Sequence, residues 1–247
     1  MGSTGTVLRE LRGAQKTAKG VSLYSRYVNR PAGRVLAAVA HRARMTPNQV
    51  TLVSAAFTFA SITAIALAGP TWALGVLVWA GLVVGFAFDS ADGQLARLTG
   101  RGGPDGEWLD HVVDCAKMVL VHTAVLISLY RADAYRIGEQ RGETWLLLPL
   151  GFLFVAVLTF CAGLLREQLG RAAQRADAPA APAGPVSRVR AVALLPADYG
   201  VFCLVFLLLG EPAAFLAGYA ALAVVHALFL VAFLAKWFRE LRALRAG

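Results

Sequence analysis

Residues 72–97 read WALGVLVWAGLVVGFAFDSADGQLAR, an apolar run that ends in two aspartates and an arginine. A run of this length suits a helix that crosses the hydrocarbon core of a bilayer, which takes about 20 residues. Asp89 and Asp92 lie at its end, and Asp110 and Asp114 lie near the start of the next apolar run. Because an unpaired carboxylate is costly to remove from water, acids at the ends of two membrane helices require a compensating partner. A bound divalent metal ion is the partner that this pattern favours.

Long apolar blocks, rather than alternating faces, dominate the 247-residue chain, whose composition is 57% apolar and 16% charged. They predict an all-α integral membrane protein with six transmembrane helices. The expected spans are residues 46–68, 72–95, 108–130, 145–165, 199–209 and 212–238. The fifth span is short, so we expect its helix to begin near Val189 and to kink at Pro196.

Positive charges are distributed unevenly among the connections. Arginine and lysine crowd residues 1–45, the connection 166–190 and the C-terminal tail, whereas the first, third and fifth connections carry few or balanced charges. This is the positive-inside pattern, so we expect both termini and the loop 97–106 on the cytoplasmic side of the cell (inner) membrane. The formal net charge of +9 therefore reflects topology and does not indicate nucleic-acid binding.

Two regions are expected along the chain. Residues 1–45 form a cytoplasmic N-terminal segment, and residues 46–247 form the six-helix membrane domain. Within the first region, apolar residues are interleaved with arginines, and Pro31 suits the first turn of a helix. We expect an amphipathic helix over Pro31–Ala43 that either lies at the membrane interface on the inner leaflet or packs on the protein itself.

The spacing of the acids places each pair on one helix face, since Asp89 and Asp92 are three positions apart and Asp110 and Asp114 are four apart. The two helices are consecutive and antiparallel, so the carboxylates can converge. Oxygen ligands favour Mg²⁺ or Mn²⁺ over zinc, and two ions about 3.5–4 Å apart are typical of phosphoryl chemistry. The alternative is that each aspartate pairs with a nearby arginine or caps a helix.

Small residues and an arginine accompany the acids. Gly93 and Ala96 keep one helix face shallow, where a ligand can approach the backbone. Arg97 supplies a fixed positive charge whose planar fork suits phosphate. Gly106 ends a glycine-rich connection that we expect to leave an open mouth on the cytoplasmic side.

The chain from Asp89 to Asp114 follows the pattern Asp-x2-Asp-Gly-x2-Ala-Arg-x8-Gly-x3-Asp-x3-Asp. This pattern resembles, at every fixed position, the signature of the CDP-alcohol phosphotransferase (CDP-alcohol phosphatidyltransferase) family. The resemblance implies a membrane enzyme that transfers a phospho-alcohol from a CDP-alcohol donor to the hydroxyl of an acceptor alcohol or alcohol phosphate, with release of CMP. It also implies two Mg²⁺ or Mn²⁺ ions as cofactors and a homodimer in the lipid bilayer.

The family's functional residues carry over to matching positions. Asp89, Asp92 and Asp110 are expected to ligate the metals, and Asp114 is expected to lie near them and to act as the catalytic general base. The residues expected to contact the CDP moiety are Asp89, Asp92, Gly93, Ala96, Arg97, Gly106 and Asn48.

The acceptor site is less clearly marked. Candidate acceptor ligands are Lys117, Asp198 and Arg166. Each has a simpler interpretation: Lys117 neutralises a carboxylate, and Arg166 only sets the topology. Asp198 in turn pairs with Arg188 or Arg190.

Segments 25–31 and 46–51 are similar to those of the family branch that includes inositol-phosphate transferases of archaea and bacteria. This similarity suggests phospholipid or inositol-phosphate-type biosynthesis, with either CDP-diacylglycerol or a soluble CDP-polyol as the donor.

Two other function classes fit parts of the sequence. Intramembrane carboxylates also mark the ion pathways of cation-coupled transporters, but such sites tend to lie at the bilayer midplane between repeats. The acids of this chain lie near one membrane face, and its sequence shows no convincing repeat. The second alternative is a catalytically silent family member that binds nucleotide, and the complete set of acids argues against it.

Overall fold

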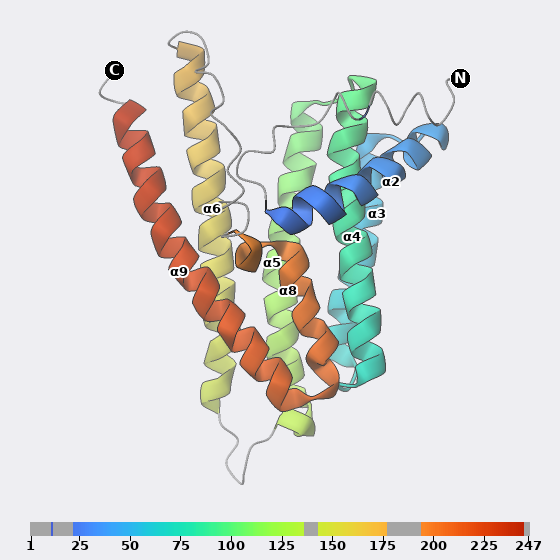
Figure 1. Cartoon of the computed structure of the whole chain (residues 1–247), viewed down its shortest axis with the longest axis vertical. Coiled ribbons are helices and arrows are strands. Elements are labelled where there is room, and N and C mark those ends of the chain that lie inside the picture. Colours follow the sequence, from blue (N-terminus) through green and yellow to red (C-terminus); the bar gives the residue numbers. More distant parts are fainter. Residues whose placement is uncertain (1–10, 12–21, 136–142, 177–193, 245–247) are drawn as a thin grey trace.

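The computed structural model describes residues 11, 22–135, 143–176 and 194–244, and every secondary-structure element within them is helical (Figure 1). The α-helices are α2 (Arg30–Arg42), α3 (Pro47–Leu67), α4 (Trp72–Thr99), α5 (Pro104–Arg131), α6 (Leu147–Ala176), α8 (Tyr199–Leu204) and α9 (Pro212–Leu244). Short π- or 3₁₀-helical segments cover Ser25–Asn29, Asp133–Tyr135, Glu143–Leu146, Leu195–Ala197 and Val205–Gly210. The predicted all-α class is confirmed for these residues.

Five helical stretches are long and apolar enough to cross a membrane. They are Pro47–Leu67, Trp72–Thr99, Pro104–Arg131, Thr144–Ala173 and Pro212–Ala243. These stretches correspond to five of the six predicted spans and make the chain an integral membrane protein. Helices α4 and α5 continue past the apolar residues, so the acids lie on regular helix rather than in the connection.

Residues 199–209 of the predicted fifth span are helical, but its predicted extension back through a kink at Pro196 is wrong. Pro196 lies in the 3₁₀ turn Leu195–Ala197, and the helix begins only at Tyr199 because Asp198, in an extended conformation, caps it by accepting a hydrogen bond from the Gly200 amide at 2.8 Å. Helix α8 and the 3₁₀ segment after it cover Tyr199–Gly210. That length rises roughly 21 Å, short of the ~30 Å hydrocarbon core. Val189 lies outside the described residues, and the six-span count stays a prediction.

The long helices form an elongated bundle (Figure 1). The starts of α3 and α5 and the ends of α4, α6 and α9 all lie at the end drawn uppermost, which we call the upper end. Helices α3, α4 and α5 run side by side, with α6 and α9 forming a second pair beyond α5. The α4–α5 connection at the upper end needs only residues 100–103, because Gly100 takes the left-handed conformation (φ 65°) that closes helix α4.

Small residues bring α3 and α4 unusually close together. A Cβ atom added at Gly81 would collide with Ser61, and one at Gly85 would collide with Thr58. Close backbone approach at such residues is the usual way in which membrane helices associate, because lipid supplies no hydrophobic force between them. The tight contact brings the polar face of α3 against the acidic end of α4.

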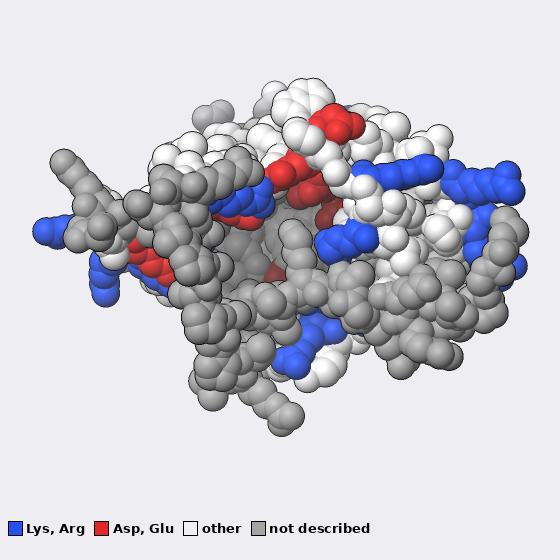
Figure 2. All heavy atoms as spheres, turned by 90° about the horizontal axis from the view of Figure 1, so that it is seen from above, with Lys and Arg blue, Asp and Glu red and all other residues white. Residues whose placement is uncertain are grey.

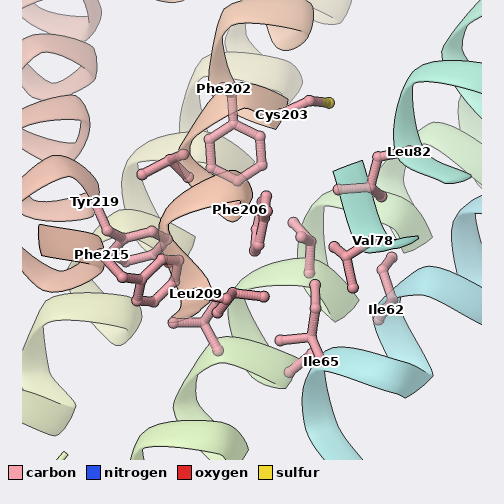
Figure 3. Close-up of a cluster of buried hydrophobic side chains, with 14 of the residues drawn as sticks. Ile62, Ile65, Val78, Leu82, Phe202, Cys203, Phe206, Leu209, Phe215 and Tyr219 are labelled. Carbon is pink, nitrogen blue, oxygen red and sulfur yellow. The ribbon is translucent and has the colours of Figure 1, made fainter. Parts of the chain in front are cut away.

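The main apolar core is a cluster of buried side chains from several helices (Figure 3). Ile62 and Ile65 of α3 meet Val78 and Leu82 of α4 in this cluster. Phenylalanines from α8, the following 3₁₀ segment and α9 complete it: Phe202, Phe206 and Phe215. The short α8 segment thus packs against α4, and the 3₁₀ segment after it packs against both α4 and α9. A second, smaller apolar cluster joins α2 to the start of α3 and the end of α4.

Helix α2 crosses α4 near the upper end (Figure 1). Its small residues Gly33, Ala37 and Ala40 are buried, and Gly33 lies so close to Ser90 of α4 that a Cβ would be 2.7 Å from the Ser90 hydroxyl oxygen. Val35 and Val39 on another face are 56% and 60% exposed. The helix therefore packs on the protein by one face and leaves an apolar face uncovered, and its placement at the membrane interface stays a prediction.

Candidate metal and nucleotide site

Three aspartates from two helices come together at the upper end. Asp89 lies in the last turns of α4, and Asp110 and Asp114 lie in the first turns of α5. One carboxylate oxygen of each lies within 4.8 Å of the corresponding oxygens of the other two. The expected convergence across the α4–α5 connection is therefore present for these three acids.

The fourth acid, Asp92, points to a different neighbour. Its side chain is buried, and its Oδ2 accepts a hydrogen bond of 2.6 Å from the Thr51 hydroxyl of α3. Its Oδ1 accepts from the Gly93 amide at 2.5 Å. Asp92 is thus adjacent to the cluster of three but oriented by α3. Thr51 was not singled out in the sequence, since its partner lies 41 residues away.

Lys117 supplies a positive charge inside the cluster. Its Nζ donates to Asp89 Oδ1 at 2.5 Å and to Asp114 Oδ1 at 3.1 Å. It also donates to the Ser54 hydroxyl of α3 at 3.2 Å, and the lysine is buried. Of the two interpretations drawn from sequence, neutralisation of carboxylates is the one that these contacts display.

A cavity of about 660 Å³ opens beside the acids at the upper end. Among the residues that line it are seven singled out in the sequence: Asn48, Asp92, Gly93, Ala96, Arg97, Gly106 and Asp110. Figure 2 looks onto this end and shows acidic side chains around a hollow, with basic side chains at its margin. Six of the seven predicted nucleotide contacts, drawn from α3, α4 and α5, therefore border one space, whereas Asp89 is not among the residues that line it.

The glycines keep the cavity open. A Cβ at Gly106 would lie 3.1 Å from the Asn48 side-chain oxygen, and one at Gly93 would lie 3.4 Å from an Arg97 nitrogen. Asn48 itself donates to Asp105 at 3.4 Å, which ties the start of α3 to the start of α5. The start of α3 is fixed in turn by a capping box in which Thr46 and Gln49 satisfy each other's backbone amides.

An ion-pair network borders the outer side of the same cavity. Arg171 of α6 contacts Glu107 of α5 and Glu167 of its own helix, each at 2.5 Å, and all three line the cavity. The four-residue spacing of Glu167 and Arg171 was visible in the sequence, but the bridge to Glu107 depends on how α5 and α6 pack. The network was missed for that reason.

The other two acceptor candidates lie elsewhere. Arg166 pairs with Glu240 of α9 at 2.7 Å. Asp198 is buried and accepts hydrogen bonds from Ser22 and, at 2.6 Å, from Ser25. Neither is among the residues that line the cavity beside the acids. The arginines expected to pair with Asp198, at positions 188 and 190, lie outside the described residues.

The donor set fits a divalent metal ion. Asp89, Asp110 and Asp114 offer only carboxylate oxygens, closely spaced and partly shielded from water. Such all-oxygen sets suit hard cations such as Mg²⁺ and Mn²⁺.

Comparison with known proteins agrees with this chemistry. The sequence pattern of the CDP-alcohol phosphatidyltransferase family matches residues 44–238. The chain belongs to this family. Membership places the protein among transferases of substituted phosphate groups, and divalent metal ions are the cofactors of the family.

One curated relative and two solved structures are similar to this chain. The relative, a phosphatidylinositol phosphate synthase of Corynebacterium glutamicum, is 42% identical over 73 residues, or 29% of this chain and 31% of the relative. The match thus spans about a third of that protein's length. The fold of the present chain is also similar to that of phosphatidylinositol phosphate synthase of Mycobacterium tuberculosis with CDP-DAG bound, with a TM-score of 0.55. The two sequences are 20% identical, and the match covers 85% of this chain and 94% of that one. The same enzyme in complex with manganese and citrate gives a TM-score of 0.51 and 22% identity over 82% and 87% of the two chains.

Proposed function

We propose that the protein transfers a phospho-alcohol from a CDP-alcohol to the hydroxyl of an acceptor alcohol and releases CMP. The observation that carries this proposal is the meeting of Asp89, Asp110 and Asp114 beside a cavity that Asp110 and Arg97 line. A cation site next to a basic, glycine-walled space suits a nucleoside diphosphate, whose charges need both metal and arginine.

The donor's CDP group is assigned to the cavity. Gly93, Ala96 and Gly106 leave room for the nucleotide to approach the helix backbones, and Arg97 binds phosphate oxygens. Asn48 offers an amide at the start of α3 for the cytosine or ribose.

Asp89, Asp92, Asp110 and Asp114 would hold two Mg²⁺ or Mn²⁺ ions. Bound there, the ions neutralise the diphosphate and stabilise CMP as the leaving group.

Asp114 is assigned the role of general base. The acceptor oxygen attacks the β-phosphorus of the donor, a new phosphorus–oxygen bond forms, and the bond between that phosphorus and the CMP oxygen breaks. The acceptor's hydroxyl proton passes to the Asp114 carboxylate.

The donor is proposed to be CDP-diacylglycerol and the acceptor an inositol phosphate. Support comes from the name of the C. glutamicum relative and from the CDP-DAG bound to the M. tuberculosis structure. A soluble CDP-polyol is the competing donor. The proposal also places the upper end in the cytoplasm, as the positive-inside pattern predicts, and includes a homodimer.

The test is CMP release by the purified protein in detergent with Mn²⁺, using CDP-diacylglycerol or CDP-inositol as donor and inositol phosphate, inositol or glycerol phosphate as acceptor. CMP and product mass should appear for one donor–acceptor pair. Asp114→Asn should remain folded and lose turnover, while Asp133→Asn, beyond the far end of α5, should retain it. Near-normal CMP release by Asp114→Asn would remove the base assignment. No CMP from any pair would favour the transporter or silent-member alternatives.

A further inference from the structure

Lys117 places a positively charged ammonium inside the acidic cluster, where the proposed metal ions would also bind. Its ammonium contacts carboxylates of two helices, Asp89 of α4 and Asp114 of α5, at 2.5 and 3.1 Å. The Lys117 side chain is 8% exposed, and those of Asp89 and Asp114 are 21% and 33% exposed, so these contacts are partly shielded from solvent. Ion pairs of this kind are screened little by salt, unlike exposed ones.

The ammonium is also held from the α3 side. Ser54 accepts a hydrogen bond from Lys117 at 3.2 Å and donates its own proton to the Gly85 carbonyl at 2.8 Å. Because Ser54 is fully buried where α3 and α4 pack closely, the position of its oxygen is fixed by the fold. All three donor positions of the lysine ammonium are therefore matched by acceptors.

The cluster needs such a charge when no metal is bound. Asp89, Asp110 and Asp114 place oxygens within 4.8 Å of one another. Like charges at that distance in a partly desolvated site repel strongly unless a cation lies between them. Lys117 reaches two of the three, and these two come from different helices, so its ammonium also joins α4 to α5.

We propose that Lys117 is a built-in counter-cation: it holds Asp89 and Asp114 together in the metal-free protein and competes with metal ions for the same carboxylates. This inference rests on the proposed metal site. Metal binding must then weaken the lysine's contact with at least one carboxylate. The flexible stem of lysine allows its head to move aside while the charge stays nearby.

The first test is the Mn²⁺ affinity of the EDTA-stripped full-length protein in detergent, measured from free Mn²⁺ by electron paramagnetic resonance. Removing a unit charge a few Å from the metal position should tighten Mn²⁺ binding by about ten- to a hundredfold in Lys117→Met. The matched control is Lys236→Met, which removes a lysine from an exposed pair with Glu240 on α9 and should leave the affinity unchanged. Damage to the site would weaken binding, so the direction of the change separates competition from a structural role.

The second test is thermal unfolding in EDTA. Lys117→Met should unfold at lower temperature than the wild type, and adding Asp89→Asn to it should restore part of the loss, because one unneutralised carboxylate is removed. Lys117→Gln repeats both measurements if the methionine variant does not fold.

Two results would overturn the inference: Mn²⁺ affinity that is unchanged or weaker in a folded Lys117 variant, or equal stability of variant and wild type in EDTA. Failure of the wild type to bind Mn²⁺ would instead remove the proposed metal site. In that case the EDTA measurements alone decide whether Lys117 is the counter-cation of the cluster.

Discussion

The contact between Thr51 and Asp92 gives a sharp prediction about how α3 contributes to the site. Thr51 is not part of the acidic signature, yet its hydroxyl donates a hydrogen bond to Asp92 Oδ2 at 2.6 Å. Both side chains are buried, at 3% and 6% exposure, so water cannot replace the hydroxyl without rearrangement. Thr51→Val removes the donor and nearly preserves the volume.

The magnitude follows from the charge of the acceptor. A hydrogen bond to an ionised group contributes about 1.5–3 kcal/mol. If the whole of that contribution orients Asp92 for the donor and metals, kcat/KM falls by about 10- to 150-fold, at one factor of ten for each ~1.4 kcal/mol. The methyl group that Thr51→Val introduces packs against apolar neighbours and offsets part of the loss in folding stability. It does not restore the orientation of the Asp92 carboxylate.

The assay is CMP release at saturating Mn²⁺ with the donor varied. The matched control is Thr159→Val, whose hydroxyl donates to the Val155 carbonyl of its own helix α6 at 2.7 Å. We expect the control to stay within about twofold of the wild type, as surface-like changes usually do. A Thr51→Val enzyme with kcat/KM within threefold of wild type, in a folded state, would refute the orienting role of this hydrogen bond.

Three further outcomes are expected. EDTA should abolish CMP release, and Mn²⁺ or Mg²⁺ should restore it; activity that survives EDTA would contradict the metal site. Gly85→Leu should destabilise the protein in thermal unfolding by roughly 1–3 kcal/mol through overpacking against α3. Gly151→Leu should not, because a Cβ atom there would have no described atom outside its own helix within 4 Å. Arg171→Gln breaks a half-exposed pair with Glu107 and should change kcat/KM by about fivefold at most, with less dependence on salt; a loss of a hundredfold would show that Arg171 contacts substrate.

The failure at the fifth span has a physical cause. Hydropathy gave a short apolar block, and extending it back through Pro196 was the only way to reach membrane length. In the structure the 3₁₀ turn that contains Pro196 ends before Asp198, which caps a new helix. The Asp198 carboxylate also accepts hydrogen bonds from Ser22 and Ser25, more than 170 residues away. A cap and a distant pair of hydroxyls leave no periodic signal in the sequence.

The helical class, five of the membrane-length helices and the pairs of aspartates that share a helix face are predictable from the amino-acid sequence alone. These are local properties, set by helix periodicity and by runs of apolar residues, so spacing alone reveals them. Which groups meet depends on how the helices pack: Thr51 contacts Asp92, Ser54 contacts Lys117, and Lys117 contacts Asp89. Those contacts depend on the close approach of α3 and α4 at two glycines and on the packing of α3 against both α4 and α5. The spacing of Asp89, Asp110 and Asp114 therefore indicates a cation site in the sequence, but the Lys117 ammonium beside them is identified only in the folded structure.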